Sequence, residues 1–307
     1  MKKTAFIHLG YPKTATTSLQ GGLFSTLKNI HYIGKPYKNN KLIKSFSCLF
    51  RQDSFFFNMN ENKKTIIHFI PKDKDILLSD ETLLESGSTI TADKIVIMKR
   101  LKHVFSSYNI KIILVIRSQL DMINSLYAYD RRKRNSYVTR NSWVNKLLEE
   151  PNSGILGLLD YSKVISILQK TFGCKNVKIL LFEDFKYSSG LFYKDFLKFI
   201  KEKKSYMPKQ NIHLNTRRGK FFFYYLSFMK ITQPLFSIYK LFPEKIRERI
   251  KLSKYLQLFE KKISRIGPSS NLALSKYEKA IIINKFRKTN IKLLKFNRNI
   301  KKYNYPI

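Results

Sequence analysis

The sequence predicts an α/β fold in which helices cover a central parallel sheet of about five strands. Three observations support this prediction. Short, nearly continuous apolar runs that are rich in β-branched residues recur through the first 190 residues. Helix-like segments separate those runs, and longer amphipathic segments make up most of the remaining chain. Unbroken apolar strands that alternate with helices are typical of a parallel sheet buried on both faces.

The expected strands end at polar or glycine residues, which mark the edge of the predicted sheet. These strands are residues 4–9, 30–33, 75–78, 111–116 and 177–182. Helical spacing predicts helices over residues 16–28, 92–106 and 119–132. Strands and helices that alternate in this way indicate an α/β domain.

The chain changes character after about residue 190 and becomes amphipathic and rich in lysine. We expect helices there over residues 193–204, 220–242, 244–266 and 274–299. We therefore expect a single domain over residues 1–307. Residues 1–190 would form its nucleotide-binding α/β core, and residues 191–307 a helical, strongly basic continuation.

The charge balance is extreme, with 59 Lys and Arg against 21 Asp and Glu, a net charge of +38. Positions 201–307 alone carry 27 basic and 5 acidic residues. Such a charge indicates an anionic partner, such as a phosphorylated nucleotide, an acidic glycan, an anionic lipid surface or nucleic acid. Alternatively, a lysine-rich composition reflects an AT-rich genome, so the charge alone does not decide between these readings.

The cysteine count and the apolar runs bear on where the protein works. Two cysteines, Cys48 and Cys174, exclude a disulfide scaffold and a cysteine-based zinc site. The apolar run over residues 5–9 is too short for the core of a signal peptide. The run over residues 221–242 contains charged residues and a proline, which argues against a transmembrane span. We therefore expect a cytoplasmic protein.

The segment that follows the first strand carries the first chemical signal. Gly10 leads into a tight loop that contains Lys13, and the hydroxyl side chains of Thr16, Thr17 and Ser18 open the next helix. Free N–H groups at such a position bind phosphate or sulfate. This is not a Walker A loop, because the lysine precedes the hydroxyls and no Gly-Lys pair follows. The alternative is an ordinary capped helix.

A second signal follows the fourth expected strand. Arg117 stands at the end of that strand, where α/β sheets bind ligands, and Ser125 lies eight residues later on the next helix. The arginine guanidinium is suited to bidentate phosphate recognition. In isolation, the pair also fits a solvated arginine and an unrelated serine.

These segments together resemble the sulfotransferases that use 3′-phosphoadenosine-5′-phosphosulfate (PAPS), especially the bacterial and carbohydrate-type members. The 5′-phosphosulfate loop of that family usually reads P-K-[ST]-G-T-T. By this resemblance, the nucleotide is bound at Lys13, Thr14, Ala15, Thr16, Thr17 and Ser18, and its 3′-phosphate at Arg117 and Ser125. Ala15 departs from the family glycine, which matters if this position needs a positive φ. The resemblance implies a P-loop-like three-layer fold with a helical C-terminal part.

Other segments resemble this sulfotransferase family less closely. Arg217, Arg218 and Gly219 resemble a basic segment that wraps the 3′-phosphate in part of the family, although lysines and arginines are common throughout this half. Glu81, after the third strand, is the first candidate for the general base, or else a first-turn carboxylate next to a capping Asp80. His68 is the alternative base.

Two further segments are expected to be structural. We expect His8, within the first strand, to be a core or second-layer residue. Glu183 and Asp184 also match the family pattern, and we interpret them as helix-capping residues at the end of the sheet.

The implied activity is sulfuryl transfer by in-line displacement from PAPS to a hydroxyl or amine, without a metal ion. The acceptor would be a cell-surface glycan or lipid-linked saccharide, and no nucleic acid is expected as a partner. Residues 221–242 would either bind an anionic membrane peripherally at its inner face or pack in the core. The alternative functions are a P-loop-like nucleotide kinase or NTPase and a basic nucleic-acid-binding protein.

Overall fold

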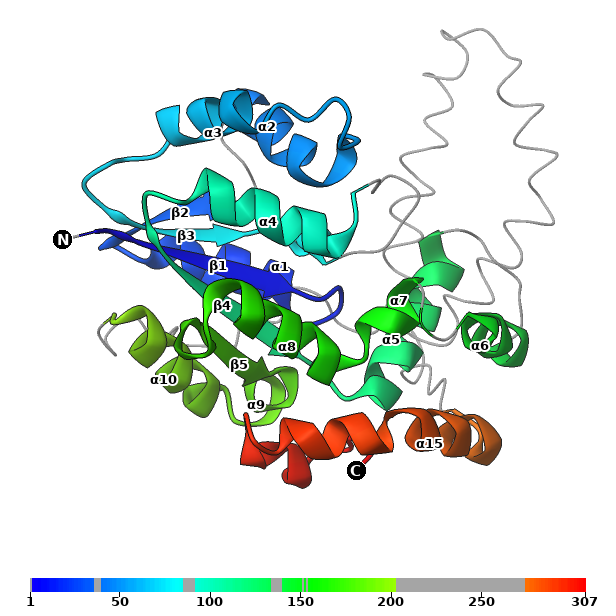
Figure 1. Ribbon diagram of the computed structural model, residues 1–307. Coiled ribbons are helices and arrows are strands. Elements are labelled where there is room, and N and C mark those ends of the chain that lie inside the picture. Colours follow the sequence, from blue (N-terminus) through cyan, green and yellow to red (C-terminus); the bar gives the residue numbers. More distant parts are fainter. Residues whose placement is uncertain are drawn as a thin grey trace, which may run out of the picture.

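A five-stranded, all-parallel sheet forms the centre of the computed structural model, which describes residues 2–35, 40–84, 92–133, 140–150, 152, 154–202 and 274–307 (Figure 1). The strands are β1 (Thr4–Gly10), β2 (Ile30–Gly34), β3 (Asp75–Ser79), β4 (Asn109–Ile116) and β5 (Val177–Leu181). They lie in the order β2-β3-β1-β4-β5. The predicted α/β class and strand number are confirmed, and each strand lies within about two residues of its expected bounds.

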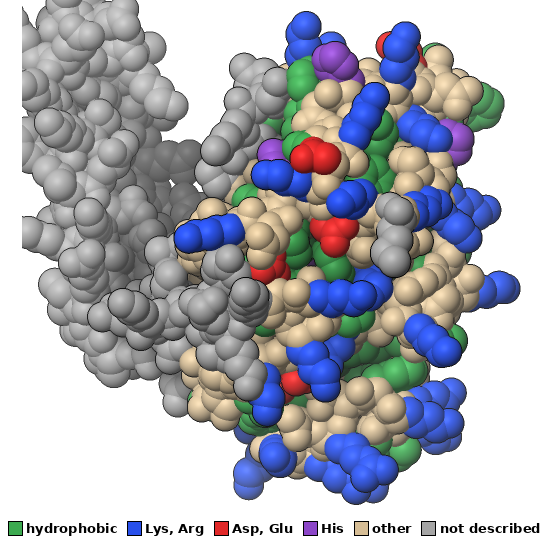
Figure 2. Space-filling view, turned by 90° about the vertical axis from the view of Figure 1, so that its left-hand side faces the viewer, with side chains coloured by type: hydrophobic (Ala, Val, Ile, Leu, Met, Phe, Trp, Pro, Cys, Tyr) green, Lys and Arg blue, Asp and Glu red, His purple; other side chains and the backbone are tan. Residues whose placement is uncertain are grey.

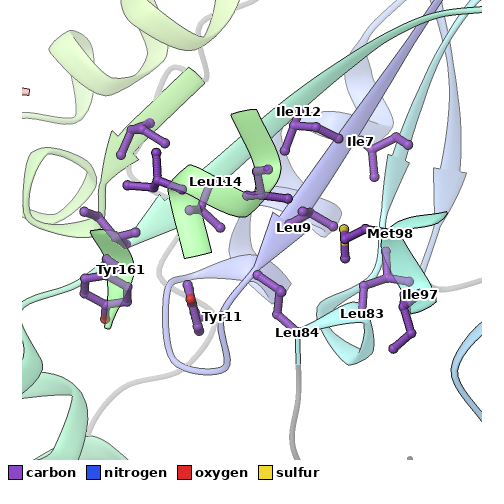
Figure 3. Packing of buried hydrophobic residues seen from close by; sticks show 14 of the residues in the cluster. Ile7, Leu9, Tyr11, Leu83, Leu84, Ile97, Met98, Ile112, Leu114 and Tyr161 are labelled. Atoms are coloured by element: carbon purple, nitrogen blue, oxygen red, sulfur yellow. The ribbon is translucent and has the colours of Figure 1, made fainter. Parts of the chain in front are cut away.

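Two hydrophobic clusters lie on opposite faces of the sheet, because successive strand residues point to alternate sides. On one face, Ile7 and Leu9 belong to a cluster with residues of α4 (Lys94–Val104), α8 (Tyr161–Phe172) and α15 (Lys276–Leu293). On the other face, Phe6 packs with residues of α1 (Thr16–Gly22) and α10 (Ser189–Ile200). The fold therefore has three layers, and Figure 3 shows part of the first cluster.

Most of the remaining helices contribute buried residues to one of these two clusters. These are α2 (Asn40–Arg51), α3 (Met59–His68), α5 (Gln119–Lys133), α6 (Arg140–Glu149), α7 (Gly154–Leu158) and α9 (Phe182–Tyr187). Short 3₁₀ turns span Phe24–Thr26, Glu81–Leu83, Cys174–Asn176 and Arg298–Lys302. Helices α2, α3, α6, α7 and α8 are not among the elements expected from the sequence.

Several helix ends differ from the expected ones for local reasons. The helix expected over residues 16–28 ends at Gly22, because the glycine pair there is a weak helix former. Helix α10 ends at Ile200, where Lys201 takes the left-handed conformation. Helix α15 starts at Lys276, behind a capping box formed by Ser275 and Glu278. The helices expected over residues 220–242 and 244–266 lie outside the described residues.

Candidate active site

The carboxyl ends of β1 and β4 lie side by side and form the edge at which the candidate site is built. The two strands pair in parallel from Thr4 with Asn109 to Gly10 with Val115. Helix α1, which follows β1, packs on one face of the sheet, whereas α5, which follows β4, packs on the other. Strands whose helices diverge in this way open a crevice between their carboxyl ends, where α/β sheets bind ligands.

The loop between β1 and α1 turns sharply through two residues in the left-handed region. Lys13 has φ 70° and Ala15 has φ 61°. Thr14 Oγ1 donates a hydrogen bond of 2.6 Å to the carbonyl of Tyr11, which closes the turn. Ala15 therefore occupies a conformation that glycine adopts with less strain, at the position where the family sequence has glycine.

Gly10 is required here because its α-carbon lies against the side chain of Thr16. A Cβ atom at Gly10 would lie 2.4 Å from Thr16 Oγ1 and 3.1 Å from His8 Cε1. Thr16 is 3% exposed, and its Oγ1 has no hydrogen-bond partner among the described residues. A buried hydroxyl without a partner at the start of α1 fits a site that accepts a polar ligand.

Lys13 lies half-buried at the outer end of this loop. Its Nζ is 4.1 Å from the centroid of the Tyr129 ring on α5, a cation–π contact that holds the ammonium beside the loop. Ser125 lies one turn earlier on the same helix and is half-buried. Residues four apart share a helix face, so Ser125 lies on the face of α5 that meets the loop.

Arg117 joins the end of β4 to the same loop. Its Nη1 donates a hydrogen bond of 3.0 Å to the carbonyl of Lys13. Its guanidinium carbon lies 4.5 Å from the centroid of the Phe182 ring, and the side chain is 7% exposed. The structure therefore brings Lys13 and Arg117 together, although they are far apart in the sequence.

Glu81 follows β3 at the same edge of the sheet. Ser79 pairs with His8 of β1, so the residues after Ser79 lie beside the β1 loop. Asp80 caps the short turn by accepting hydrogen bonds from Thr82 N at 2.9 Å and from Thr82 Oγ1 at 2.6 Å. Lys35 Nζ lies 3.3 Å from Asp80 Oδ1 and 3.7 Å from Glu81 Oε1. Asp80 is thus structural, while Glu81 keeps one third of its side chain exposed.

His68 lies away from the loop and does not fit the role of base. It is the last residue of α3, is exposed, and packs edge-on against Phe69 at 5.1 Å between ring centroids. The chain passes from α3 to the amino end of β3, at the edge opposite to Lys13 (left in Figure 1). The structure therefore does not bring His68, the alternative base, to the loop that carries Lys13. Arg217, Arg218 and Gly219 lie outside the described residues.

Sequence reasoning did not find the tyrosines that line this region. Tyr161 donates a hydrogen bond of 2.7 Å to the carbonyl of Arg117, and its ring packs edge-on against Tyr11 at 5.2 Å. Figure 3 shows these two rings beside one another at the end of the sheet. Tyr129 had a signal in the sequence, because it follows Ser125 by four residues. Tyr161 had none, because its partner is 44 residues away.

No protein-family model matches the chain, and no curated protein sequence matches it. Among solved structures it is similar to a sulfotransferase from Alicyclobacillus acidocaldarius, with a TM-score of 0.50 and 14% identity, over 70% of this chain and 87% of that one. The fold is that of a sulfotransferase. A second similar structure is mouse sulfotransferase SULT7A1 complexed with PAP, with a TM-score of 0.41 and 14% identity. That match covers 67% of this chain and 61% of the mouse protein.

Within this sulfotransferase fold, two further features belong to the part of the chain that the structure describes. In that part, no group of three or more His, Cys, Asp or Glu side chains is arranged to hold a metal ion. No helix there is long and apolar enough to cross a membrane. Lys and Arg side chains are spread across the face shown in Figure 2, with few acidic side chains among them.

Proposed function

We propose that this protein is a sulfotransferase that moves a sulfuryl group from PAPS to a hydroxyl or amine of an acceptor. The observation that carries the proposal is the hydrogen bond of 3.0 Å from Arg117 to the carbonyl of Lys13. It joins the two segments that resemble the 5′-phosphosulfate and 3′-phosphate elements of the family. A nucleotide with phosphates at both positions fits two cationic residues whose segments are joined at this edge of the sheet.

The loop would bind the phosphosulfate through several kinds of donor. The N–H groups after Lys13 precede the hydroxyls of Thr16, Thr17 and Ser18, and Thr16 Oγ1 lacks a partner in the described structure. The left-handed backbone at Ala15 turns the chain around the bound group. Arg117 and Ser125 would hold the 3′-phosphate, with Arg217, Arg218 and Gly219 as further contacts in a part of the chain without structural description.

The proposed reaction is an in-line displacement at sulfur. The acceptor oxygen forms a new bond to sulfur while the bond between sulfur and the bridging oxygen of the 5′-phosphate breaks. The acceptor proton passes to the carboxylate of Glu81, and Lys13 offsets the negative charge that develops on the bridging oxygen. Adenosine 3′,5′-bisphosphate leaves as the second product. Lys35, 3.7 Å from Glu81, would hold that carboxylate at the edge of the crevice.

The acceptor in this proposal is a cell-surface glycan or lipid-linked saccharide, sulfated on the cytoplasmic side. A net charge of +38 supports an anionic or membrane-linked acceptor. Residues 221–242, which lie outside the described residues, would associate peripherally with the anionic inner face of the membrane. Flotation with vesicles tests this: binding should rise with anionic lipid and fall when residues 221–223 become Ser. Protein that stays unbound at low salt refutes the membrane part.

Calorimetry with two nucleotides tests the nucleotide site. Adenosine 3′,5′-bisphosphate should bind more tightly than adenosine 5′-phosphate, which lacks the 3′-phosphate. Arg117→Ala should remove about 1.5–3 kcal/mol of that preference, the size of a charge-assisted hydrogen bond. An equal loss for both nucleotides would place Arg117 away from the 3′-phosphate. ATP bound with magnesium in preference to the bisphosphate would favour the kinase alternative.

Turnover tests the chemistry. Incubation with PAPS and a glycan extract should give a product heavier by one sulfuryl group. Lys13→Ala should lower the rate roughly 10²-fold, about 3 kcal/mol, because the lysine acts mainly in the transition state. Lys102→Ala is the matched control, since Lys102 lies on α4 and its Nζ donates to the carbonyl of Thr171. Unchanged product formation in Lys13→Ala would refute the assignment.

A further inference from the structure

A buried carboxylate lies directly behind the Arg117 turn. Glu183, in the first turn of α9, is 3% exposed. Its Oε1 accepts a hydrogen bond of 2.9 Å from the backbone N–H of Ser118, and its Oε2 accepts one of 3.0 Å from the hydroxyl of Tyr305. Both carboxylate oxygens are therefore committed to partners from distant parts of the chain. Burial raises the pKa of Glu183, because desolvation disfavours the charged carboxylate, while the hydrogen bonds from Ser118 and Tyr305 act in the opposite direction.

Two further hydrogen bonds hold the turn, one at its backbone and one at the side chain of Ser118. Tyr161 donates its hydroxyl proton to the carbonyl of Arg117 at 2.7 Å, and Ser118 Oγ donates to the carbonyl of Asn304. The backbone of the turn is thus tied to α8 and α9, and the side chain of Ser118 ties it to the segment over residues 303–307. On the opposite side, the side chain of Arg117 reaches the carbonyl of Lys13.

Residues 303–307 are themselves anchored. Tyr303 donates a hydrogen bond of 2.5 Å to Asp184 Oδ1, one residue beyond Glu183. Asn290 on α15 donates to the carbonyl of Pro306 at 2.9 Å and exchanges hydrogen bonds with Gln119 at 2.8 and 3.0 Å. The hydroxyl of Tyr305 is therefore presented to Glu183 by a fixed segment of backbone.

We propose that Glu183, held by Tyr305, is a positioning residue that sets the place of the Arg117 guanidinium for the 3′-phosphate. This inference rests on the proposed function. An arginine binds phosphate well only when its backbone and side chain are already fixed, because ordering a long side chain on binding lowers affinity. Glu183 supplies that order through the N–H of Ser118, the residue that follows Arg117. Its charge also lies near the guanidinium, which favours the ionised carboxylate.

Two neighbouring tyrosines give a matched pair of variants. Tyr305→Phe removes the hydroxyl that donates to Glu183 and leaves Oε2 of Glu183 without that donor. Tyr303→Phe makes the same chemical change at the neighbouring Asp184, whose Oδ1 accepts from Tyr303. Both changes remove one tyrosine–carboxylate hydrogen bond, so a general loss of stability affects both, whereas a positioning effect appears only in Tyr305→Phe.

Calorimetry with adenosine 3′,5′-bisphosphate and adenosine 5′-phosphate tests the role. Tyr305→Phe should weaken the bisphosphate about five- to tenfold, the effect of one hydrogen bond, while the 5′-phosphate changes less than about twofold. Glu183→Gln, which keeps an acceptor for Ser118 but loses the charge, should show the same selectivity. Tyr303→Phe should leave the ratio of the two affinities unchanged. If the ratio of the bisphosphate affinity to the 5′-phosphate affinity is the same in Tyr305→Phe and Tyr303→Phe, the proposal is overturned.

Amide hydrogen exchange gives a second measurement that needs no nucleotide. The N–H of Ser118 should exchange faster in Tyr305→Phe than in wild type, and at the wild-type rate in Tyr303→Phe. If the wild type shows no preference for the bisphosphate, the proposed function fails, and the exchange rate then decides whether Glu183 orders the turn. Unchanged exchange in Tyr305→Phe refutes the positioning role whatever the nucleotide data show.

Discussion

His8 should make the folded protein sensitive to acid, and replacing it should remove much of that sensitivity. The side chain is fully buried in β1, and its Nδ1 lies 2.8 Å from Ser79 Oγ. Gln20 Nε2 donates to the same Oγ at 3.1 Å, so the hydroxyl proton of Ser79 is directed to Nδ1. The imidazole proton then sits on Nε2, which has no hydrogen-bond partner among the described residues. A second proton would turn Nδ1 into a donor that faces a hydroxyl already accepting from Gln20, and it would place a buried charge on the ring.

Burial lowers the pKa of His8 from 6.5 to about 3. Its folded-state pKa is depressed, so the associated stability is present above 6.5 and is lost as the pH falls toward about 3. In that window the unfolded chain binds a proton that the folded chain does not. Within this window each pH unit lowers the unfolding free energy by about 1.4 kcal/mol. A fall of roughly 1.5 units, from 6.5 to about pH 5, therefore removes about 2 kcal/mol of unfolding free energy.

Urea unfolding at about pH 7.5 and about pH 5 measures this effect. His8→Asn keeps an acceptor near the place of Nδ1 and removes the titrating ring, so it should lose about 2 kcal/mol less than wild type between the two pH values. Its stability at neutral pH should fall, but the prediction concerns the difference between pH values. His68→Asn, at an exposed histidine, is the control and should behave as wild type. Equal pH dependence in wild type and His8→Asn would refute the reasoning.

Three other predictions concern the loop and the support of α2. Ala15→Gly should raise the unfolding free energy by about 1 kcal/mol, because Ala15 has φ 61°. Lys201→Gly, at φ 62°, should raise the Tm by a similar amount, and a lower Tm in both variants would contradict the left-handed assignment. Gly10→Ala should lower the unfolding free energy by about 1–3 kcal/mol, because the added Cβ would lie 2.4 Å from Thr16 Oγ1. Adding Thr16→Ala should restore part of the lost Tm, and a double variant with no recovery would point to another cause. Arg100→Leu should lower the unfolding free energy measured in urea by about 3 kcal/mol, because Arg100 is 2% exposed and its guanidinium donates to three backbone carbonyls. If the variant is as stable as wild type, those carbonyls find other donors.

Much of the architecture was readable from the sequence because its signals are local. An apolar run such as residues 111–116 indicates a buried strand whichever strands it pairs with. All five strands were therefore predicted close to their observed bounds. The loop after β1 was equally readable, since a glycine, a lysine and three hydroxyls follow one another within a few residues. Helices α2 and α3 were missed although the sequence carries signals for both. The buried residues Leu42, Phe46 and Leu49 recur at helical spacing along α2, and Asn58 caps α3 by accepting a hydrogen bond from the N–H of Glu61.

The positions of the two candidate bases relative to Lys13 needed the tertiary structure. Glu81 and His68 both flank the same strand in the sequence, but they lie at its opposite ends in space. The parallel pairing of β3 with β1 places the end of β3 that precedes Glu81 beside the loop that carries Lys13. Such pairing depends on contacts between segments about 70 residues apart, which no local pattern records.

The sequence by itself therefore determined the fold class, the strands and the residues with the chemistry for binding an anion. Only the tertiary structure decided how those residues are held. Arg117 reaches Lys13 over 104 residues, and Tyr305 reaches Glu183 over 122. A strand or a loop is specified by neighbours along the chain, and it leaves a periodic or compositional trace. A hydrogen bond between buried groups from distant segments leaves no such trace, because its partners meet only after the sheet and its covering helices have packed.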